Sequence, residues 1–370
     1  MINGISILIV CCGRVMLLEE LFKSIVIARA NHSSPSEIIV VDNSKSEEAV
    51  KIQQLCRRYG ADYYYDSSSV AIKRNVAASH AKYHILYFCD SDCVVTPDIL
   101  NRHINAYEQN NIGAVAGPVI LQGEGNSFND MLMETAWCTA FSQPLNVPYV
   151  EWGVTANFSV RQDVFSQIHG FNEKFPNKPG GEDVDMGFRI SDAGYLIKCA
   201  PQAIVYHSNK TWLKLKDVAS RLFSYGKSNV LVVKEHPNRL IGDVNWVVLF
   251  LLCALASIVP AIIYDWKICF VAPLFAAIYL IFICINKAVR LRKNIITVFK
   301  LELLSAIEKT GTIAGCFKYK TLKPLFRQVL YSKYQEHGTM PENQWTYFSV
   351  LIALSSVFLY LFLIGLGLNI

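Results

Sequence analysis

Two aspartates separated by one residue end an apolar run in the N-terminal half of the chain. The stretch reads YFCDSDCVV over residues 87–95 and carries Asp90 and Asp92. Side chains at positions i and i+2 of an extended chain share a face, so the two carboxylates point the same way and repel each other. A hard divalent cation shared with a phosphate would relieve this repulsion. A solvated acidic turn after a strand is the alternative interpretation.

A second acidic cluster reads GGEDVDMGFR over residues 180–189. Its two glycines free the backbone to approach a ligand. Three carboxylates, Glu182, Asp183 and Asp185, then open a predicted helix, where the helix dipole favours negative charge. An acidic helix start without a function is the alternative. Asp185 and Arg189 are four residues apart, which predicts an ion pair on one helix face.

The elements that must position these residues alternate between strand and helix. Apolar, β-branched runs predict strands, and amphipathic runs between them predict helices, at 5–10 (strand), 17–30 (helix), 37–41 (strand), 47–59 (helix), 61–65 (strand), 70–81 (helix) and 84–88 (strand). This order predicts an α/β fold with a mostly parallel sheet, in which ligands bind at the carboxyl ends of strands. Asp42 and Asp90 both stand at such ends, which favours a binding site. No glycine-rich phosphate loop follows the first strand, which argues against a dinucleotide oxidoreductase or a P-loop NTPase.

Seven short motifs occur in the order in which family 2 glycosyltransferases of the GT-A fold carry them. They are VDNS, KRN, FCDSD, NFSVR, GFNE, GGEDVDMGFRI and VYH. Residues 4–230 therefore resemble this family, and most closely its mycofactocin-glycosyltransferase-like and rhamnosyltransferase-like branches. The stretch RLFSYGK at 221–227 also resembles an R-x-x-x-Y-G-[KR] segment of membrane-tethered members.

The resemblance implies a site for a nucleotide-diphosphate sugar, with a UDP-sugar favoured, and a Mn²⁺ or Mg²⁺ cofactor. Asp42 would bind the nucleobase and Arg74 would lie near the nucleotide. Asp92, the second carboxylate of the D-x-D motif, would ligate the metal, and Asp90 would contact the ribose or a metal-bound water. His207, at the end of the VYH strand, is a candidate third metal ligand, with a structural histidine as the alternative.

The resemblance further implies an inverting, hexosyltransferase-type reaction. Asp183 matches the family's general base, and Glu182 is its rival for that role. Arg221 and Lys227 would steady the diphosphate or else face the anionic bilayer surface. Trp152 would stack on an acceptor sugar, with core packing as the alternative.

The chain departs from the family pattern at two places. It has Val10-Cys11 where many members carry a proline-threonine pair after the first strand, so a threonine contact to the nucleobase is lost. It lacks the Q-x-x-R-W motif of the processive synthases, which predicts a non-processive enzyme. The alternatives from other classes are a catalytically inactive sugar-nucleotide-binding membrane protein and a transporter-associated regulatory subunit.

Beyond residue 240 the composition changes. Hydrophobic residues make up 52% of the 370-residue chain, and the excess is concentrated in three apolar segments, at about 246–264, 268–286 and 348–368. Each approaches the roughly 20 residues that a membrane-spanning helix needs. The net charge of +5 is too modest to argue for nucleic acid as a partner.

The basic segment 287–344 between the second and third apolar segments predicts the membrane orientation. By the positive-inside tendency it is cytoplasmic, and its part at 291–334 is predicted to include helices along the inner leaflet. We therefore expect a cytoplasmic GT-A domain over 1–240 and a membrane region over 241–370, in the cell membrane. This arrangement favours a lipid-linked or membrane-proximal acceptor in a cell-envelope glycan. The 11 cysteines show no metal-site spacing and are predicted to be reduced.

Overall fold

The computed structural model describes residues 3–331 except 126, 134–135, 177–179, 244, 264–265 and 267–270. The described chain divides into two compact units, one made of residues 3–218 with Tyr331 and the other of residues 219–330. The division falls inside helix α9 (Leu215–Glu235), whereas the composition placed the end of the catalytic domain at residue 240. Each unit is described separately below.

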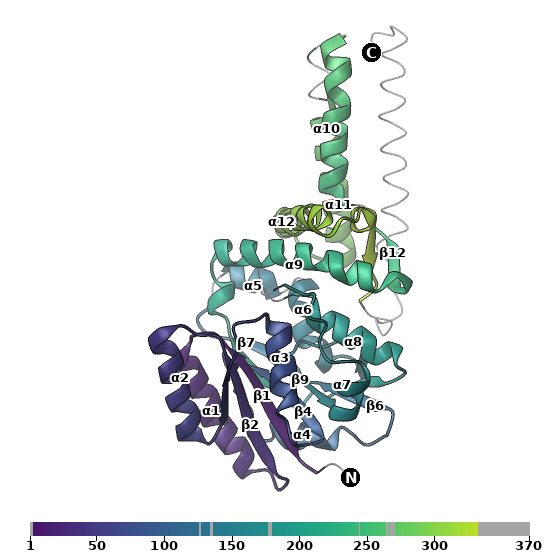
Figure 1. Ribbon diagram of the computed structural model, residues 1–370. Coiled ribbons are helices and arrows are strands. Elements are labelled where there is room, and N and C mark those ends of the chain that lie inside the picture. Colours follow the sequence, from purple (N-terminus) through teal and green to yellow (C-terminus); the bar gives the residue numbers. More distant parts are fainter. Residues whose placement is uncertain are drawn as a thin grey trace. The chain divides into compact units, whose positions relative to one another are not determined.

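An eight-stranded sheet forms the centre of the first unit (Figure 1), with the strand order β3-β2-β1-β4-β9-β6-β10-β8. Its strands are β1 (Ile5–Cys11), β2 (Ser36–Asp42), β3 (Asp62–Tyr65), β4 (Ile85–Asp90), β6 (Ile112–Ala116), β8 (Tyr149–Val150), β9 (Asn157–Arg161) and β10 (Leu196–Cys199). The pairs β1–β2, β1–β4, β2–β3 and β6–β10 are parallel, while β9 runs antiparallel to β4 and β6, and β8 antiparallel to β10. The predicted α/β fold with a mostly parallel sheet is confirmed.

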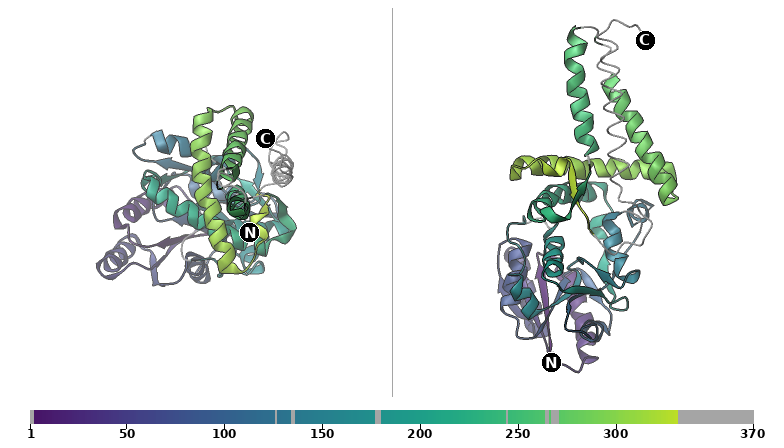
Figure 2. Two further views of the ribbon diagram at one scale, coloured as in Figure 1. Left: turned by 90° about the horizontal axis from the view of Figure 1, so that it is seen from above. Right: turned by 90° about the vertical axis from the view of Figure 1, so that its right-hand side faces the viewer.

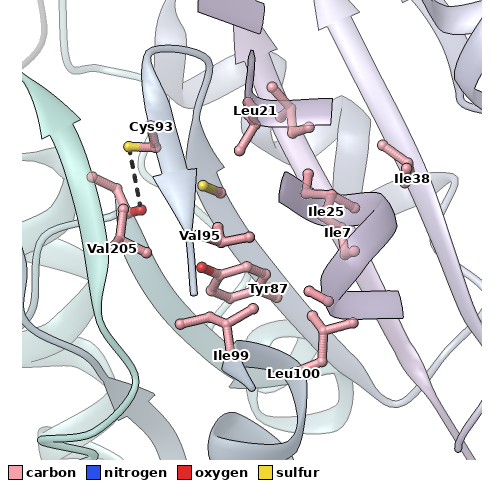
Figure 3. Packing of buried hydrophobic residues seen from close by; sticks show 14 of the residues in the cluster. Ile7, Leu21, Ile25, Ile38, Tyr87, Cys93, Val95, Ile99, Leu100 and Val205 are labelled. Carbon is pink, nitrogen blue, oxygen red and sulfur yellow. Dashed lines mark hydrogen bonds between the residues drawn. The ribbon is translucent and has the colours of Figure 1, made fainter. Parts of the chain in front are cut away.

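Helices cover both faces of this sheet, which explains why its central strands β1, β2 and β4 are mostly apolar. They are α1 (Val15–Ala30), α2 (Ser46–Tyr59), α3 (Val70–Ser79), α4 (Ile99–Asn105), α7 (Gln162–Gln167) and α8 (Glu182–Asp192); the short α5 (Ser127–Met133) and α6 (Ala136–Ser142) complete the unit. Alternate residues of β1 face opposite layers: Ile7 packs with Leu21 and Ile25 of α1, as Figure 3 shows, while Leu8 belongs to the core under α3, α7 and α8.

A second, three-stranded sheet brings distant parts of the chain to the end of β4. It consists of β5 (Cys93–Val95), β11 (Val205–Ser208) and β7 (Val119–Gln122), in the order β5-β11-β7. The antiparallel pairing of β5 with β11 sets His207 opposite Cys93. Because β5 begins directly after Ser91-Asp92, this register places His207 beside the D-x-D turn.

The second unit contains α9, three long helices and a short two-stranded sheet. The helices are α10 (Trp246–Ile263), α11 (Val271–Leu291) and α12 (Ile295–Tyr319), and β12 (Leu240–Gly242) pairs antiparallel with β13 (Arg327–Val329). α10 and α11 pack side by side, and α12 crosses them (Figure 2).

Glycines let α9 and α12 approach each other to backbone contact. A Cβ atom at Gly226 would lie 1.9 Å from the carbonyl oxygen of Glu308, and one at Gly311 would lie 2.2 Å from that of Phe223. Both distances are shorter than any side chain allows. The glycine of the RLFSYGK stretch therefore has a packing role in this unit.

The described residues contain one helix long and apolar enough to cross a membrane, α10, judged by length and composition. It coincides with the first predicted span. The second predicted span falls on α11, whose described apolar part, Ala277–Val289, is shorter than a span. The third, at 348–368, lies outside the described residues. The multi-pass arrangement predicted from the sequence is thus not supported beyond one candidate helix.

Candidate active site

Two carboxylates and an imidazole converge where β4 ends. Asp90 is the last residue of β4, and Asp92 lies in the turn before β5. His207 Nε2 lies 3.3 Å from Asp92 Oδ1 and 3.9 Å from Asp90 Oδ2. The Ser208 amide donates to the carbonyl oxygen of Asp92 over 3.0 Å, which fixes the turn against β11. The structure therefore brings together the three residues that the sequence proposed as metal ligands.

The tautomer of His207 follows from its other ring nitrogen. Nδ1 lies 2.8 Å from the carbonyl oxygen of Ser208, and a carbonyl only accepts hydrogen bonds, so Nδ1 carries the hydrogen. In the neutral ring, Nε2 then directs a lone pair at two carboxylates. A cation between these groups would remove the repulsion between the nitrogen lone pair and the carboxylate oxygens. A metal-binding histidine usually donates the N–H of its other ring nitrogen to a carbonyl or carboxylate, as His207 does here.

The donor atoms at this corner suit a divalent cation of the Mg²⁺ or Mn²⁺ type. One ligand atom each from Asp92, Cys93 and His207 lie within 4.8 Å of one another. The Cys93 thiol donates to the carbonyl oxygen of Ala156 over 3.9 Å, and burial raises the pKa of this thiol well above its ordinary value, so it stays protonated. Oxygen ligands with one imidazole remain, and this set fits Mn²⁺ or Mg²⁺.

Arg14 also reaches Asp92, and the sequence did not single it out. It follows the end of β1 after Cys12 and Gly13, and its Nη1 donates to Asp92 Oδ2 in an ion pair. The basic residue after the carboxyl end of a strand was the one available signal, because parallel strands end at the same edge of the sheet. Its contact with Asp92 spans 78 residues and has no spacing pattern.

Arg74 of α3 joins the two acidic motifs. Its Nη1 lies 2.9 Å from Glu182 Oε1 and its Nη2 lies 3.4 Å from Asp90 Oδ1. The side chains of Arg74 and Glu182 are each 5% exposed, so their ion pair is shielded from water, whereas Asp90 is 33% exposed and its pair with Arg74 is shielded on one side. The D-x-D turn and the start of α8 thus face the same guanidinium.

The two rivals for the general base differ in their surroundings. Besides its ion pair with Arg74, Glu182 accepts a hydrogen bond from the Gly180 amide over 2.7 Å, so its two oxygens are occupied. Asp183 accepts from the Val184 amide over 2.9 Å. Burial and the repulsion from Glu182 raise the pKa of Asp183 to about 7, against a lowering effect of Arg74. A carboxyl group with a pKa near neutrality is suited to accept a proton at that pH.

Replacement of Arg74 by methionine is expected to destabilise the protein by about 3–5 kcal/mol, because Glu182 and Asp90 lose their shared buried cation. The pKa of Asp183 should rise further, since Arg74 lowers it. Urea unfolding measures the first effect. The matched control is Arg102→Met: Arg102 is 45% exposed and pairs with Asp98 across one helix turn, so its loss should cost less than about 1 kcal/mol. Equal losses in both variants would contradict the assigned role.

Asp42, the predicted nucleobase ligand, is completely buried at the end of β2. Its Oδ1 accepts hydrogen bonds from the amide and hydroxyl of Ser44 and from the Cys11 thiol, and its Oδ2 accepts from the Tyr63 hydroxyl over 3.1 Å. A direct contact with a nucleobase requires one of these donors to move, and the role of Asp42 stays a prediction.

Trp152 lies against α8, one turn after Asp183. A Cβ atom at Gly187 would be 2.4 Å from Trp152 Cα, so this glycine admits the Trp152 segment to the helix. The half-buried Trp152 ring lies 6.1 Å from the ring of Tyr331. Its stacking on an acceptor sugar stays a prediction, as do the diphosphate contacts of Arg221 and Lys227, which lie on α9 in the second unit.

The GFNE turn is held from both neighbouring helices. The Asn75 side chain on α3 accepts from the Phe171 amide over 2.8 Å and donates to the Phe171 carbonyl over 2.9 Å. Arg189 on α8 donates to the Gly170 carbonyl over 2.7 Å and also binds Asp185, which confirms the predicted i,i+4 pair. Asn75 directly follows Arg74, so the KRN motif both binds the acidic residues through Arg74 and holds the GFNE turn through Asn75.

The sequence of this chain is similar to that of a known protein family. Residues 17–238 match the model of the family described as "Glycosyltransferase like family 2". The chain belongs to this family. The match covers more than half of the chain and includes every candidate site residue except Arg14, which confirms the resemblance drawn from the motifs.

Two Mycobacterium tuberculosis proteins are similar over part of their length. An N-acetylglucosaminyl-diphospho-decaprenol L-rhamnosyltransferase is 33% identical over 102 residues, which is 27% of this chain and 32% of the relative. A pre-mycofactocin glycosyltransferase is 23% identical over 177 residues, 47% of this chain and 37% of the relative. The chain thus matches about a third of the length of these curated relatives.

Among solved structures, a mannosyltransferase from Pyrobaculum calidifontis in complex with GDP-Man and Mn²⁺ superimposes with a TM-score of 0.52. The match covers 86% of each chain at 15% sequence identity. This similarity shows that the fold is that of GT-A transferases.

Proposed function

We propose that this protein is an inverting, metal-dependent, non-processive glycosyltransferase of the hexosyltransferase type. It moves a sugar from a nucleotide-diphosphate donor, with a UDP-sugar favoured, to a lipid-linked or membrane-proximal acceptor. The observation that carries the proposal is the pair of contacts made by Arg74. Its guanidinium binds Asp90, which lies beside Asp92 and His207, and it also binds Glu182 at the start of α8. The candidate metal ligands and the candidate base therefore lie on either side of one side chain.

The donor side of the reaction uses the D-x-D corner. Asp92 and His207, with Asp90 beside them, would hold Mn²⁺ or Mg²⁺, which when bound supplies positive charge to the departing nucleoside diphosphate. Arg74 fixes the orientation of Asp90 through their ion pair. The shielding of Asp92 and Arg74 from water makes each of these charges more effective than it would be at an open surface.

The acceptor side uses the start of α8. Asp183 takes the proton of the acceptor hydroxyl while that oxygen attacks the anomeric carbon from the face opposite the diphosphate, so one displacement inverts the configuration. Glu182 is committed to Arg74 and the Gly180 amide, and we assign it the positioning of Arg74 rather than proton transfer. We assign to Trp152, which packs against α8 at Gly187, one turn after Asp183, the stacking on the acceptor sugar.

The relatives and α10 support the acceptor class. One relative acts, by its name, on a diphospho-decaprenol-linked sugar, and α10 is a candidate membrane span in this chain. An enzyme attached to a bilayer meets a lipid-linked acceptor in two dimensions, which raises its effective concentration. We place the catalytic unit on the cytoplasmic side of the cell membrane, in agreement with the basic segment that follows α11.

The test is a donor panel with the full-length protein in detergent. UDP-, GDP- and dTDP-sugars are supplied with Mn²⁺ and with either a polyprenyl-diphosphate-linked sugar or a soluble sugar, and product is followed by mass spectrometry and NMR. We expect one donor to support Mn²⁺-dependent transfer to the lipid-linked sugar, with inverted anomeric configuration. Donor binding without transfer or hydrolysis under any condition would favour the catalytically inactive alternative, and retained configuration would refute the single displacement.

A further inference from the structure

The ion pair between Arg14 and Asp92 has no part in the reaction as proposed. Arg14 Nη1 binds Asp92 Oδ2, and His207 Nε2 faces the other oxygen of the same carboxylate. The Asp92 side chain is 5% exposed, and a buried carboxylate needs a compensating cation. In the protein without bound metal, Arg14 is that cation.

The backbone of Arg14 is held by hydrogen bonds, while its side chain is partly exposed. Arg14 has a φ of 59°, an unusual left-handed conformation for a residue other than glycine, and its carbonyl accepts from the Leu17 and Leu18 amides at the start of α1. The preceding Gly13 donates to the Ser44 hydroxyl over 2.6 Å. The Arg14 side chain is 44% exposed, and Asp92 is its one recorded partner among the described residues.

Arg14 and a divalent metal ion would share one carboxylate. Arg14 holds Asp92 Oδ2, and a metal ion held by Asp92 Oδ1 and His207 would stand near the guanidinium, where the two cations repel each other. A diphosphate resolves the conflict, because its oxygens match the fork of N–H groups on a guanidinium and give Arg14 a new anionic partner. The Arg14 side chain is 44% exposed, so a ligand can reach it from solvent.

We propose that Arg14 is an internal cation that neutralises Asp92 in the free protein and transfers to the diphosphate when metal and nucleotide bind together. This inference rests on the proposed function, since it concerns the same metal site. It makes metal and nucleotide binding mutually dependent: each raises the affinity for the other, and by thermodynamic linkage the two factors are equal. The free protein consequently binds the metal weakly.

The test measures Mn²⁺ affinity of the full-length protein by electron paramagnetic resonance, with and without UDP, GDP or dTDP. For Arg14→Gln we expect the affinity of the nucleotide-free protein for Mn²⁺ to rise on the order of 10-fold, and the gain from the best nucleotide to shrink by a similar factor. Arg14→Lys, which keeps the charge without the fork, should fall between. The control is Arg102→Gln at an exposed surface pair, which should match the wild type.

A purely structural role of Arg14 predicts different melting temperatures and a different Mn²⁺ affinity for Arg14→Gln. Then Arg14→Gln would lower the melting temperature equally with and without Mn²⁺, and Mn²⁺ affinity would not rise. We expect instead that the variant is destabilised in a chelator and regains wild-type stability with Mn²⁺, because the ion replaces the missing cation.

The outcomes separate this inference from the proposed function. If the wild type binds Mn²⁺ through Asp92 but Arg14→Gln leaves both affinity and coupling unchanged, the role of Arg14 is overturned and the metal site stands. If no form of the protein binds Mn²⁺ with any of the three nucleotides, the metal-dependent function fails, and this inference fails with it.

Discussion

Asp183→Asn should reduce sugar transfer by about 10²–10⁴-fold, the range that a general base contributes, while the affinity for the donor stays within about 2-fold of the wild type, since Asp183 has no role on the donor side. Transfer by the wild type should rise with pH through about 7, as Asp183 loses its proton. The measurements are single-turnover rates over pH 5–9 and donor binding by calorimetry. In Asp183→Asn the rise through pH 7 should be absent.

The melting temperature of Asp183→Asn distinguishes a loss of catalysis from a loss of folding. The pKa of Asp183 in the folded protein lies above its ordinary value of 3.8, so between these values the folded state binds more protons than the unfolded state. The free energy of unfolding therefore falls as pH rises, and ionised Asp183 destabilises the fold at neutral pH. Asp183→Asn should melt at the wild-type temperature or above. The rival variant Glu182→Gln, which disturbs the Arg74 pair, should melt lower and still show a rise of transfer with pH, shifted to lower pH because the charge of Glu182 raises the pKa of Asp183. A rise that is lost in Glu182→Gln and kept in Asp183→Asn would make Glu182 the base.

Asp92→Asn should weaken Mn²⁺ binding by about 100-fold or more and reduce transfer at least as much, because the variant loses a charged oxygen ligand at the centre of the cluster. A chelator should abolish transfer by the wild type, and added Mn²⁺ should restore it. Paramagnetic resonance of bound Mn²⁺ and transfer rates at several Mn²⁺ concentrations check the result.

Asp98→Asn is the control for Asp92→Asn. Asp98 is an exposed aspartate at the start of α4, where it pairs with Arg102, and its replacement should leave both Mn²⁺ binding and transfer unchanged. Transfer that depends on Mn²⁺ with wild-type affinity in Asp92→Asn would exclude Asp92 as a ligand.

The parallel part of the sheet was predictable because its signal is local. Strands covered on both faces are mostly apolar, and the polar residues at their carboxyl ends, such as Asp42 and Asp90, mark the edge where ligands bind. The strands that became β9 and β11 could be predicted from their local pattern, but their antiparallel pairing with β4, β6 and β5 could not, since it joins residues far apart in the chain. The pairing of β5 with β11 decides whether His207 reaches Asp92.

Contacts between residues far apart in the chain also decide the roles of the site residues, and local sequence does not show them. Glu182 and Asp183 are adjacent acidic residues that no sequence pattern distinguishes, and their difference arises from Arg74, which α3 brings to Glu182. Arg14 had no motif at all, and a left-handed turn aims it at Asp92. In the membrane region, hydropathy predicted three spans, of which the structure supports α10.

The double attachment of the GFNE turn limits how this enzyme could be redesigned. Asn75 and Arg189 bind the same loop, so this loop links the helix that carries Arg74 to the helix that carries Asp183. On the roles proposed for Arg74 and Asp183, this link would set the spacing between leaving group and attacking oxygen. A change of acceptor would then have to come from residues around these two helices, with Trp152, the proposed acceptor contact, as the first position to vary.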